Sequence, residues 1–189
     1  MKHIDKILQS KKTIFTYDDI ALLLSMDNRD TIKSFFARSI EQGVFVSISQ
    51  GIYGLRDYNL FELASRFKKL SYISFETVLK ASGIIFQDYG NTIFSASDNT
   101  ITKHNKDIAF TYLKVKNSIL THPLWLINTG SYIIATPERA ICDRLYLSAD
   151  YYFDHLEWVD YRLLERISQI YNKRVILSIQ KLIKNAQSR

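Results

Sequence analysis

Residues 27–55 constrain the fold more than any other part of this sequence. A helical pattern of apolar residues starts behind a polar cap and ends at Gly43, which suits the left-handed position that closes a helix. Two short apolar runs follow and meet at Gln50-Gly51, where the glycine supplies the positive φ that a tight hairpin turn needs. The predicted elements are a helix at about 27–42 and two strands at 44–49 and 52–55.

Two shorter helical patterns precede this stretch, at residues 1–10 and 17–25. Thr16 and Asp19 have the spacing of a capping box at the start of the second one. Three helices followed by a hairpin is the order of a winged helix-turn-helix, in which the third helix enters a major groove and the hairpin, the wing, lies beside it. The sequence therefore predicts such a DNA-binding domain at residues 1–58.

Residues 59–189 predict a second, mixed α/β domain with a small antiparallel sheet and C-terminal helices, so the whole chain is expected to be α+β. A linking helix lies within 59–72. Ser74 is expected to cap one helix, and Thr136 another that starts with Pro137. The predicted strands are 92–96, 108–115, 124–127 and 132–135, and the predicted helices are 74–83, 136–147, 160–171 and 174–186.

Composition excludes several classes of protein. The 189 residues are 47% hydrophobic, which argues against global disorder. Cys142 is the only cysteine, so neither an internal disulfide nor a cysteine zinc cluster is expected, and a reducing cytoplasm is the natural compartment. The first twelve residues lack the apolar core of a signal peptide, and no apolar stretch is long enough to span a membrane.

Five residues of the 27–42 helix lie off its apolar stripe and form the predicted DNA-reading face. Arg29, Lys33 and Arg38 can reach phosphate or guanine, and Thr31 and Ser34 can reach base edges or phosphate. The alternative is that they form the solvated face that any surface helix presents. The net charge of +6 and the pI near 9.3 permit nucleic-acid binding without requiring it.

In the predicted wing, Ser49 and Gln50 can hydrogen-bond to phosphate but carry no charge, and Arg56 lies just beyond the second strand. The wing could equally be a hairpin that only covers the core. A second basic region, in and after an expected loop, comprises Lys103, Lys106, Lys114 and Lys116, with His104 among them. It could extend a DNA footprint, face an acidic partner, or be a solvated loop.

No catalytic or metal-binding pattern is evident, so we expect no enzyme, no metal and no cofactor. The four histidines lack metal-ligand spacing, and neither a G-x-S-x-G turn nor a glycine-rich phosphate loop occurs. Cys142 lies in an apolar pattern and is expected in the core. Residues 150–158, DYYFDHLEW, are aromatic and acidic. They could bind a protein or pack the last helices against the sheet.

Three stretches together resemble the AbiEi-type antitoxins of type IV toxin–antitoxin, or abortive-infection, systems. The first is the predicted winged helix, with Gly51 and Tyr53 in the returning strand; the others are YISFETVLKASGII and IATPERAICDRLYL. The resemblance covers most of residues 12–185, and TPERAICD is its most specific part. In TPERAICD, Arg139 and Asp143 can pair at i,i+4, which contributes about a few tenths of a kcal/mol if the pair is exposed.

The resemblance implies a bifunctional protein of phage defence. Its N-terminal domain would bind inverted repeats in its own promoter and repress the operon, reading DNA with the predicted face. Its C-terminal domain would counteract a nucleotidyltransferase toxin, without catalysis. Two alternatives stay open: a stand-alone winged-helix regulator with a sensing or dimerising C-terminal domain, and a nucleic-acid-processing enzyme.

Overall fold

A computed structural model describes residues 2–187, and the chain divides into two compact units, Met1–Arg66 and Phe67–Arg189. Both contain helices and strands, so the chain is α+β, as predicted. The units divide after Arg66, later than the boundary predicted at 58/59. The reason is that α4 (Leu60–Phe67) is tied to the first unit: the buried Glu62 carboxylate accepts hydrogen bonds from the backbone N and the hydroxyl of Thr13.

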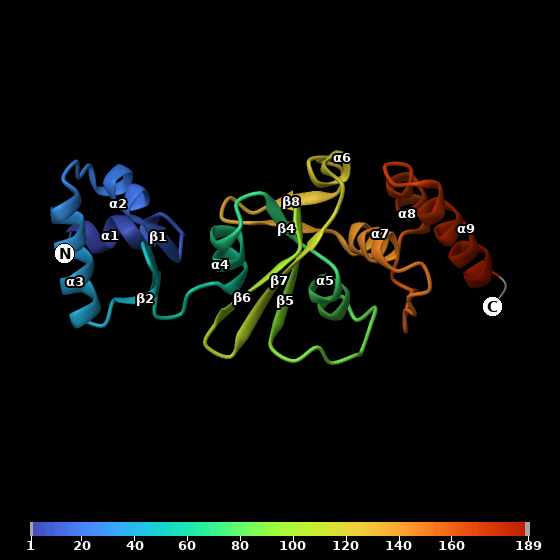
Figure 1. Cartoon of the computed structure of the whole chain (residues 1–189), viewed down its shortest axis with the longest axis horizontal. Coiled ribbons are helices and arrows are strands. Elements are labelled where there is room, and N and C mark those ends of the chain that lie inside the picture. Colours follow the sequence, from blue (N-terminus) through green and yellow to red (C-terminus); the bar gives the residue numbers. More distant parts are fainter. Residues whose placement is uncertain (1, 188–189) are drawn as a thin grey trace. The chain divides into compact units, whose positions relative to one another are not determined.

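Unit 1 begins with three helices and a three-stranded antiparallel sheet (Figure 1). The sheet order is β1-β3-β2, so the first strand pairs with the returning strand of the hairpin. β1 was not predicted, because three residues give too short a run for periodicity to reveal. The elements before α4 are α1 (Lys2–Gln9), β1 (Ile14–Thr16), α2 (Tyr17–Leu24), α3 (Arg29–Glu41), β2 (Phe45–Ser49) and β3 (Ile52–Leu55).

Local signals in unit 1 behave as predicted. Thr16 and Asp19 form the capping box of α2: the Asp19 carboxylate accepts from the Thr16 backbone N at 2.9 Å, and the Thr16 hydroxyl accepts from the Asp19 backbone N at 3.3 Å. Gly43 follows the last turn of α3 with φ +71°, and Gly51 in the hairpin turn has φ +73°. Both are conformations that glycine adopts without the strain a Cβ would bring.

The core of unit 1 joins α2, α3 and the sheet through aromatic rings. Phe36 lies at its centre, with ring centroids 5.3 Å from Phe45 edge-on and 3.7 Å from Tyr53 in a stacked pair. Phe15 adds an edge-on contact with Phe45 at 5.6 Å. Such pairs contribute roughly 0.5–1.5 kcal/mol each beyond the burial of their area. They fix the hairpin against the inner face of α3.

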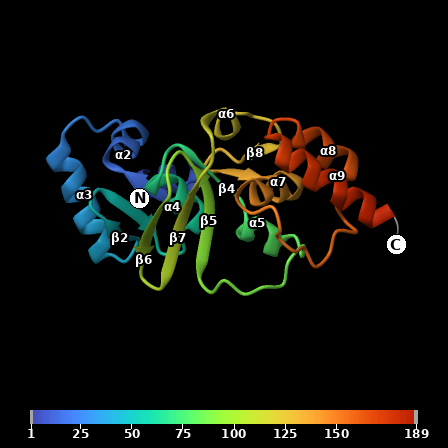
Figure 2. The same ribbon diagram turned by 45° about the vertical axis from the view of Figure 1, so that its right-hand side comes forward.

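Unit 2 is built on one sheet, with α5 and α6 beside it and the last three helices toward the C-terminus (Figures 1 and 2). α7 lies between the sheet and the pair formed by the last two helices. The elements are β4 (Ser71–Ile73), α5 (Glu76–Ala81), β5 (Thr92–Ser97), β6 (Ile101–Asn105), β7 (Ile108–Lys114), α6 (Asn117–Leu120), β8 (Leu126–Asn128), β9 (Ile133–Ala135), α7 (Pro137–Leu147), α8 (Tyr161–Ser168) and α9 (Lys173–Gln187).

The prediction of a small antiparallel sheet in this unit is wrong. The described residues form a six-stranded mixed sheet in the order β6-β7-β5-β4-β9-β8, with β5–β7 and β4–β9 parallel. Two strands were not predicted from the sequence. β4 is only three residues long, and the polar side chains of β6, which suit an edge strand, resemble those of a loop. Since β7 inserts between β5 and β6, strands adjacent in sequence are not always adjacent in the sheet.

Of the two helix caps predicted in unit 2, one is confirmed and one is wrong. Thr136 caps α7, with its hydroxyl accepting from the Arg139 backbone N, and Pro137 is the first helical residue, as predicted. The prediction for Ser74 is wrong: Phe75 is the N-cap of α5, with φ +54°, and makes no side-chain cap bond. The Ser74 hydroxyl instead donates to the Asp143 carboxylate at 2.7 Å.

Within residues 2–187, no helix is both long enough and apolar enough to cross a bilayer.

Candidate functional site

The start of α3 is fixed by its own sequence. The Asn28 side chain caps the helix and accepts hydrogen bonds from the backbone N atoms of Asp30 and Thr31 at 2.8 and 3.3 Å. Ile32 and Phe36 anchor the inner face in the core. The caps and the apolar stripe together determine which side chains of α3 face solvent, and all five predicted DNA-reading residues of this helix are exposed.

One flank of the exposed face carries Arg29 and Lys33, which are one helical turn apart. The Arg29 guanidinium carbon lies 5.3 Å from the ring centroid of Tyr17, a cation–π contact that restrains it. Lys33 Nζ lies 3.7 Å from the Asp30 carboxylate, and both side chains are mostly exposed. An exposed ion pair of this kind contributes little to stability, at most about 1 kcal/mol. Lys33 can therefore leave Asp30 and bind another anion.

Tyr17 was missed by the sequence analysis and connects three elements of unit 1. Its hydroxyl lies 3.0 Å from that of Tyr53 in β3, and its ring packs edge-on against Phe36. Burial and the hydrogen bond with Tyr17 raise the pKa of Tyr53 to about 12. The Tyr53 phenol therefore stays neutral at physiological pH, and Tyr17 contacts Arg29 through its ring.

The other flank of α3 borders a hollow of about 450 Å³ between α1 and α3. Thr31, Ser34 and Arg38 line it from α3, with His3 facing them from α1. The predicted DNA-reading residues of α3 thus fall into two groups on different flanks of one helix. Acidic side chains lie between them, because Asp30 and Glu41 are also exposed.

The hairpin residues lie at different places. Ser49 and Gln50 are exposed at the tip, beside a register irregularity in the pairing of β2 with β3. Arg56 reaches the C-terminal end of α3, where a Cβ built on Gly43 would lie 3.0 Å from Nη2 of Arg56. α3 has 13 residues and is therefore about 20 Å long, so Arg29 and Arg56 lie at opposite ends of the candidate interface.

The second basic region is not a single patch. Lys103 lies in β6, not in a loop, and its Nζ donates to the Phe67 carbonyl oxygen at 2.8 Å. Lys106 is in the turn between β6 and β7, whereas Lys114 ends β7 and Lys116 precedes α6. At about 3.3 Å per residue, the length of β7 separates Lys106 from Lys114 and Lys116 by more than about 20 Å.

The most heavily bonded cluster of unit 2 is fully buried and surrounds Asp143, a residue of the TPERAICD stretch. The hydroxyls of Tyr72, Ser74 and Tyr171 donate to its carboxylate at 2.9, 2.7 and 2.6 Å. Arg139 Nε lies 3.7 Å from the same carboxylate, and neither side chain is exposed. The predicted i,i+4 pair is therefore present, and it is buried because Tyr72, Ser74 and Tyr171 cover this face of α7.

Arg139 also binds α6 and the segment that follows it. Its Nη1 donates to the Leu124 carbonyl oxygen at 2.9 Å, and its Nη2 donates to the Ile119 carbonyl oxygen at 2.7 Å and to the Tyr72 hydroxyl at 3.2 Å. Burial raises the pKa of the Asp143 carboxyl, although Arg139 and the three hydroxyls work against it. We call Tyr72, Ser74, Arg139, Asp143 and Tyr171 the buried hub. Its hydrogen bonds connect α7 with other segments of unit 2 and indicate a structural role.

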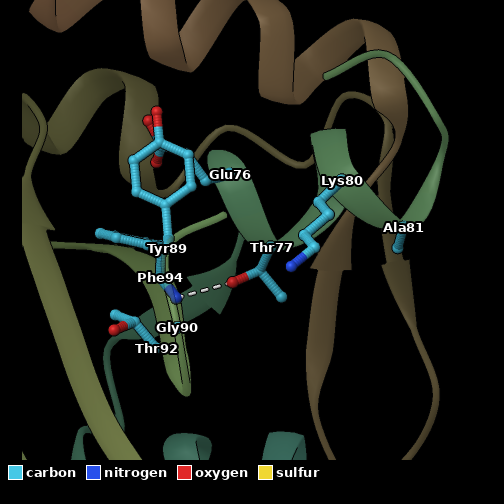
Figure 3. A pocket seen from close by; sticks show the side chains of 8 residues that line it. All are labelled: Glu76, Thr77, Lys80, Ala81, Tyr89, Gly90, Thr92 and Phe94. Carbon is cyan, nitrogen blue, oxygen red and sulfur yellow. Dashed lines mark hydrogen bonds between the residues drawn. The ribbon is translucent and has the colours of Figure 1, made fainter. Parts of the chain in front are cut away.

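A hollow of about 250 Å³ lies beside α5 and β5 (Figure 3). Three of its polar side chains have partners within the fold. The Thr77 hydroxyl accepts from the Phe94 backbone N at 2.7 Å, Lys80 pairs with Asp88 at 2.8 Å, and the Tyr89 hydroxyl bonds to Gln87 at 2.6 Å. Glu76, which is 4% exposed, pairs with Arg144 through Oε1 at 3.3 Å, whereas its buried Oε2 has no hydrogen-bond partner among the described residues.

In the part of the chain that the structure describes, no group of three or more His, Cys, Asp or Glu side chains is placed to hold a metal ion. A scan against models of known protein families finds no match to this sequence, and a search of curated proteins finds none either. The resemblance to AbiEi-type antitoxins thus stays a prediction drawn from the residues.

Proposed function

We propose that this protein is an antitoxin and autorepressor that binds operator DNA through unit 1 and counteracts a nucleotidyltransferase toxin. The observation that carries the DNA-binding part is the element order α1-β1-α2-α3-β2-β3 with sheet order β1-β3-β2. A capped helix with an exposed polar face, followed directly by a hairpin, is the arrangement that places a recognition helix in a major groove with a wing beside it.

The two ends of α3 supply different contacts in this proposal. Arg29 and Lys33 bind phosphate or guanine at the N-terminal end, with Arg29 restrained by Tyr17. Arg56 binds phosphate at the C-terminal end, and the uncharged tip of the hairpin adds hydrogen bonds from Ser49. Because acidic residues interrupt the exposed face, binding depends on where each cation lies rather than on bulk charge.

The antitoxin part rests on the likeness of the TPERAICD stretch. Its Arg139 and Asp143 belong to the buried hub, so the motif supports a shared fold of unit 2 and offers no direct contact to a toxin. A toxin-contacting surface must therefore be sought elsewhere on unit 2.

A mobility-shift titration on the chain's own promoter fragment tests DNA binding. We expect a discrete complex that a shuffled fragment of equal length does not form. Arg29→Ala with Lys33→Ala should weaken it at least tenfold, since each bidentate base contact contributes about 1–3 kcal/mol. Lys173→Ala on α9 is the matched control. Equal affinity for both fragments would refute operator recognition.

Co-expression with the adjacent nucleotidyltransferase gene tests the antitoxin part. We expect growth to be restored by the full chain and not by a frameshifted copy. If the promoter is bound but growth is not restored, the stand-alone regulator replaces the antitoxin. Divalent-metal-dependent nicking of DNA by the pure protein would instead support the nucleic-acid-processing enzyme.

A further inference from the structure

One carboxylate oxygen at the start of α5 is buried without a hydrogen-bond partner among the described residues. Oε1 of Glu76 pairs with Nη1 of Arg144, whereas no donor reaches Oε2. The Arg144 guanidinium carbon lies 4.6 Å from the ring centroid of Tyr151, a cation–π contact that restrains it beside Oε1. A buried acceptor without a donor is costly and rare in native proteins, so Oε2 marks a position where a donor is expected to bind.

Glu76 lines the hollow of about 250 Å³ beside α5 and β5 (Figure 3). Sites for drug-sized molecules usually enclose about 300–1,000 Å³, so this hollow suits a smaller ligand. Much of its wall is apolar: the rings of Tyr89 and Phe94 lie edge-on with centroids 5.6 Å apart, and Ala81 lines it from α5. A ligand that fits these walls has an apolar group for the rings and a hydrogen-bond donor for Glu76.

Lys80 supplies a cation to the same hollow. It follows Glu76 by four residues in α5, a spacing that brings two side chains of a helix onto one face, and both line the hollow. Lys80 pairs with Asp88 at 2.8 Å, but the Lys80 side chain is 51% exposed and that of Asp88 is 78% exposed. An exposed pair contributes little to stability, so the Lys80 ammonium can leave Asp88 and bind an anionic group of a ligand.

The segment that carries Tyr89 can open the hollow. Residues 85–90 form neither helix nor strand, and most of them are exposed. Tyr89 is only partly buried, and its hydroxyl bonds to Gln87 at 2.6 Å and to Tyr151 at 2.9 Å. Irregular segments with few buried contacts open at low cost in free energy. Movement of the Tyr89 ring would give a ligand access to the Glu76 carboxylate.

We propose that this hollow binds a small α-amino acid with an apolar side chain. The ammonium group of the ligand donates to Oε2 of Glu76, its carboxylate pairs with Lys80, and its side chain packs against Tyr89 and Phe94. The ion pairs made by Glu76 and by Lys80 each sum to zero charge, so the hollow favours neither a net cation nor a net anion, whereas a zwitterion complements both ends. The inference goes beyond the proposed function and does not depend on DNA binding by unit 1.

Isothermal titration calorimetry of the full chain with L-phenylalanine, L-leucine and L-methionine tests the site. We expect at least one of them to bind one-to-one with a dissociation constant of about 0.1 mM, in keeping with a ligand of about ten non-hydrogen atoms. Phenethylamine lacks the carboxylate of phenylalanine, and hydrocinnamate lacks its ammonium group. Each should bind at least about tenfold more weakly than phenylalanine, because one charge-assisted contact is lost.

Two variants locate the ligand. Glu76→Gln keeps an oxygen for Arg144 but puts an amide donor in place of Oε2, so affinity should fall at least about tenfold. Lys80→Met, at an exposed position, should weaken binding by about as much and keeps the test decisive if Glu76→Gln is unstable. Lys181→Met, at an exposed position of α9, is the matched control and should stay within about twofold of the wild type. Thermal unfolding followed by tryptophan fluorescence shows whether unit 2 of each variant is folded.

Loss of affinity in Glu76→Gln and Lys80→Met, with Lys181→Met unchanged, supports the proposal. If none of the three amino acids binds the wild type up to about 10 mM, a hundredfold above the expected dissociation constant, the proposal is overturned and solvent alone satisfies Oε2. Undiminished binding in both hollow variants would place the ligand elsewhere and overturn the site. Equal affinity for phenylalanine and phenethylamine would overturn the assignment of a zwitterion.

Discussion

Replacing Arg139 by Met should destabilise unit 2 strongly. Arg139→Met keeps much of the side-chain volume but leaves the Asp143 carboxylate without its cation and frees the carbonyl oxygens of Ile119 and Leu124. Breaking a buried pair by removing one partner costs about 3–5 kcal/mol, and each orphaned carbonyl adds to this. We expect a loss of about 4 kcal/mol, a large part of the 5–15 kcal/mol that stabilises an ordinary domain.

Urea unfolding followed by tryptophan fluorescence measures this change. Both tryptophans, Trp125 and Trp158, lie in unit 2, so the signal reports that unit. With a urea slope of about 2 kcal/mol per molar, the midpoint should fall by about 2 M. Arg162→Met, at an exposed position of α8, is the matched control and should change stability by less than about 0.5 kcal/mol. A shift below about 0.5 M for Arg139→Met would refute the structural role assigned to the buried hub.

Three further predictions concern the interior of each unit. Burial raises the pKa of Asp19, but hydrogen bonds from Thr16 and the cations Lys12 and Arg66 outweigh it and leave the pKa below its ordinary value. Asp19→Asn should therefore cost about 1–2 kcal/mol at pH 7, and the deficit should vanish as pH falls below about 4; equal deficits at pH 7 and pH 3, by thermal unfolding, would contradict this. Burial raises the pKa of Cys142 well above its usual range, so a thiol reagent should label it only in denaturant, and rapid labelling of the native protein would contradict the structure. Gly54→Ala would place a Cβ 2.8 Å from side-chain carbons of Ile48 and Tyr58, and should lower the melting temperature of unit 1 through about 1–3 kcal/mol of overpacking; an unchanged melting temperature would contradict this.

Features that depend on a few neighbouring residues could be predicted from the sequence. The capping box at Thr16, the cap at Thr136 and the glycine that ends α3 each involve groups within four residues of one another. Their energetics are local, so the same residues give the same geometry in many folds. The helix and hairpin of the candidate interface were predicted for this reason.

Features that depend on residues far apart in the sequence could not be predicted. β4 and β9 pair in parallel although some sixty residues separate them, and three-residue strands carry no periodicity of their own. Ser74 has the chemistry of an N-cap, but the buried Asp143 carboxylate takes its hydroxyl instead. A hydrogen bond from a hydroxyl to a buried carboxylate contributes more to stability than a cap at a helix end, so the tertiary contact overrides the local preference.

In the candidate interface too, local features were predicted from the sequence, whereas contacts that depend on tertiary packing were not. Exposure of Arg29 and Lys33 followed from the apolar stripe of α3, whereas the contact between Arg29 and Tyr17 depends on how α2 and α3 pack. An aromatic residue directly after a helix cap is a weak signal, because most such residues only fill the core. The place of Lys103 in a strand depends on the pairing of β6 with β7, which the sequence does not specify.

The salt dependence of operator affinity tests most directly whether Arg29 and Lys33, at the N-terminal end of α3, bind DNA phosphates. For each phosphate contact, the logarithm of the binding constant falls with the logarithm of salt concentration by a slope of about 0.9. Arg29→Ala with Lys33→Ala should make the wild-type slope shallower by about 2, with weaker binding at every salt concentration. An identical slope in the wild type and the double variant would contradict the account, because those two side chains would then not touch the DNA.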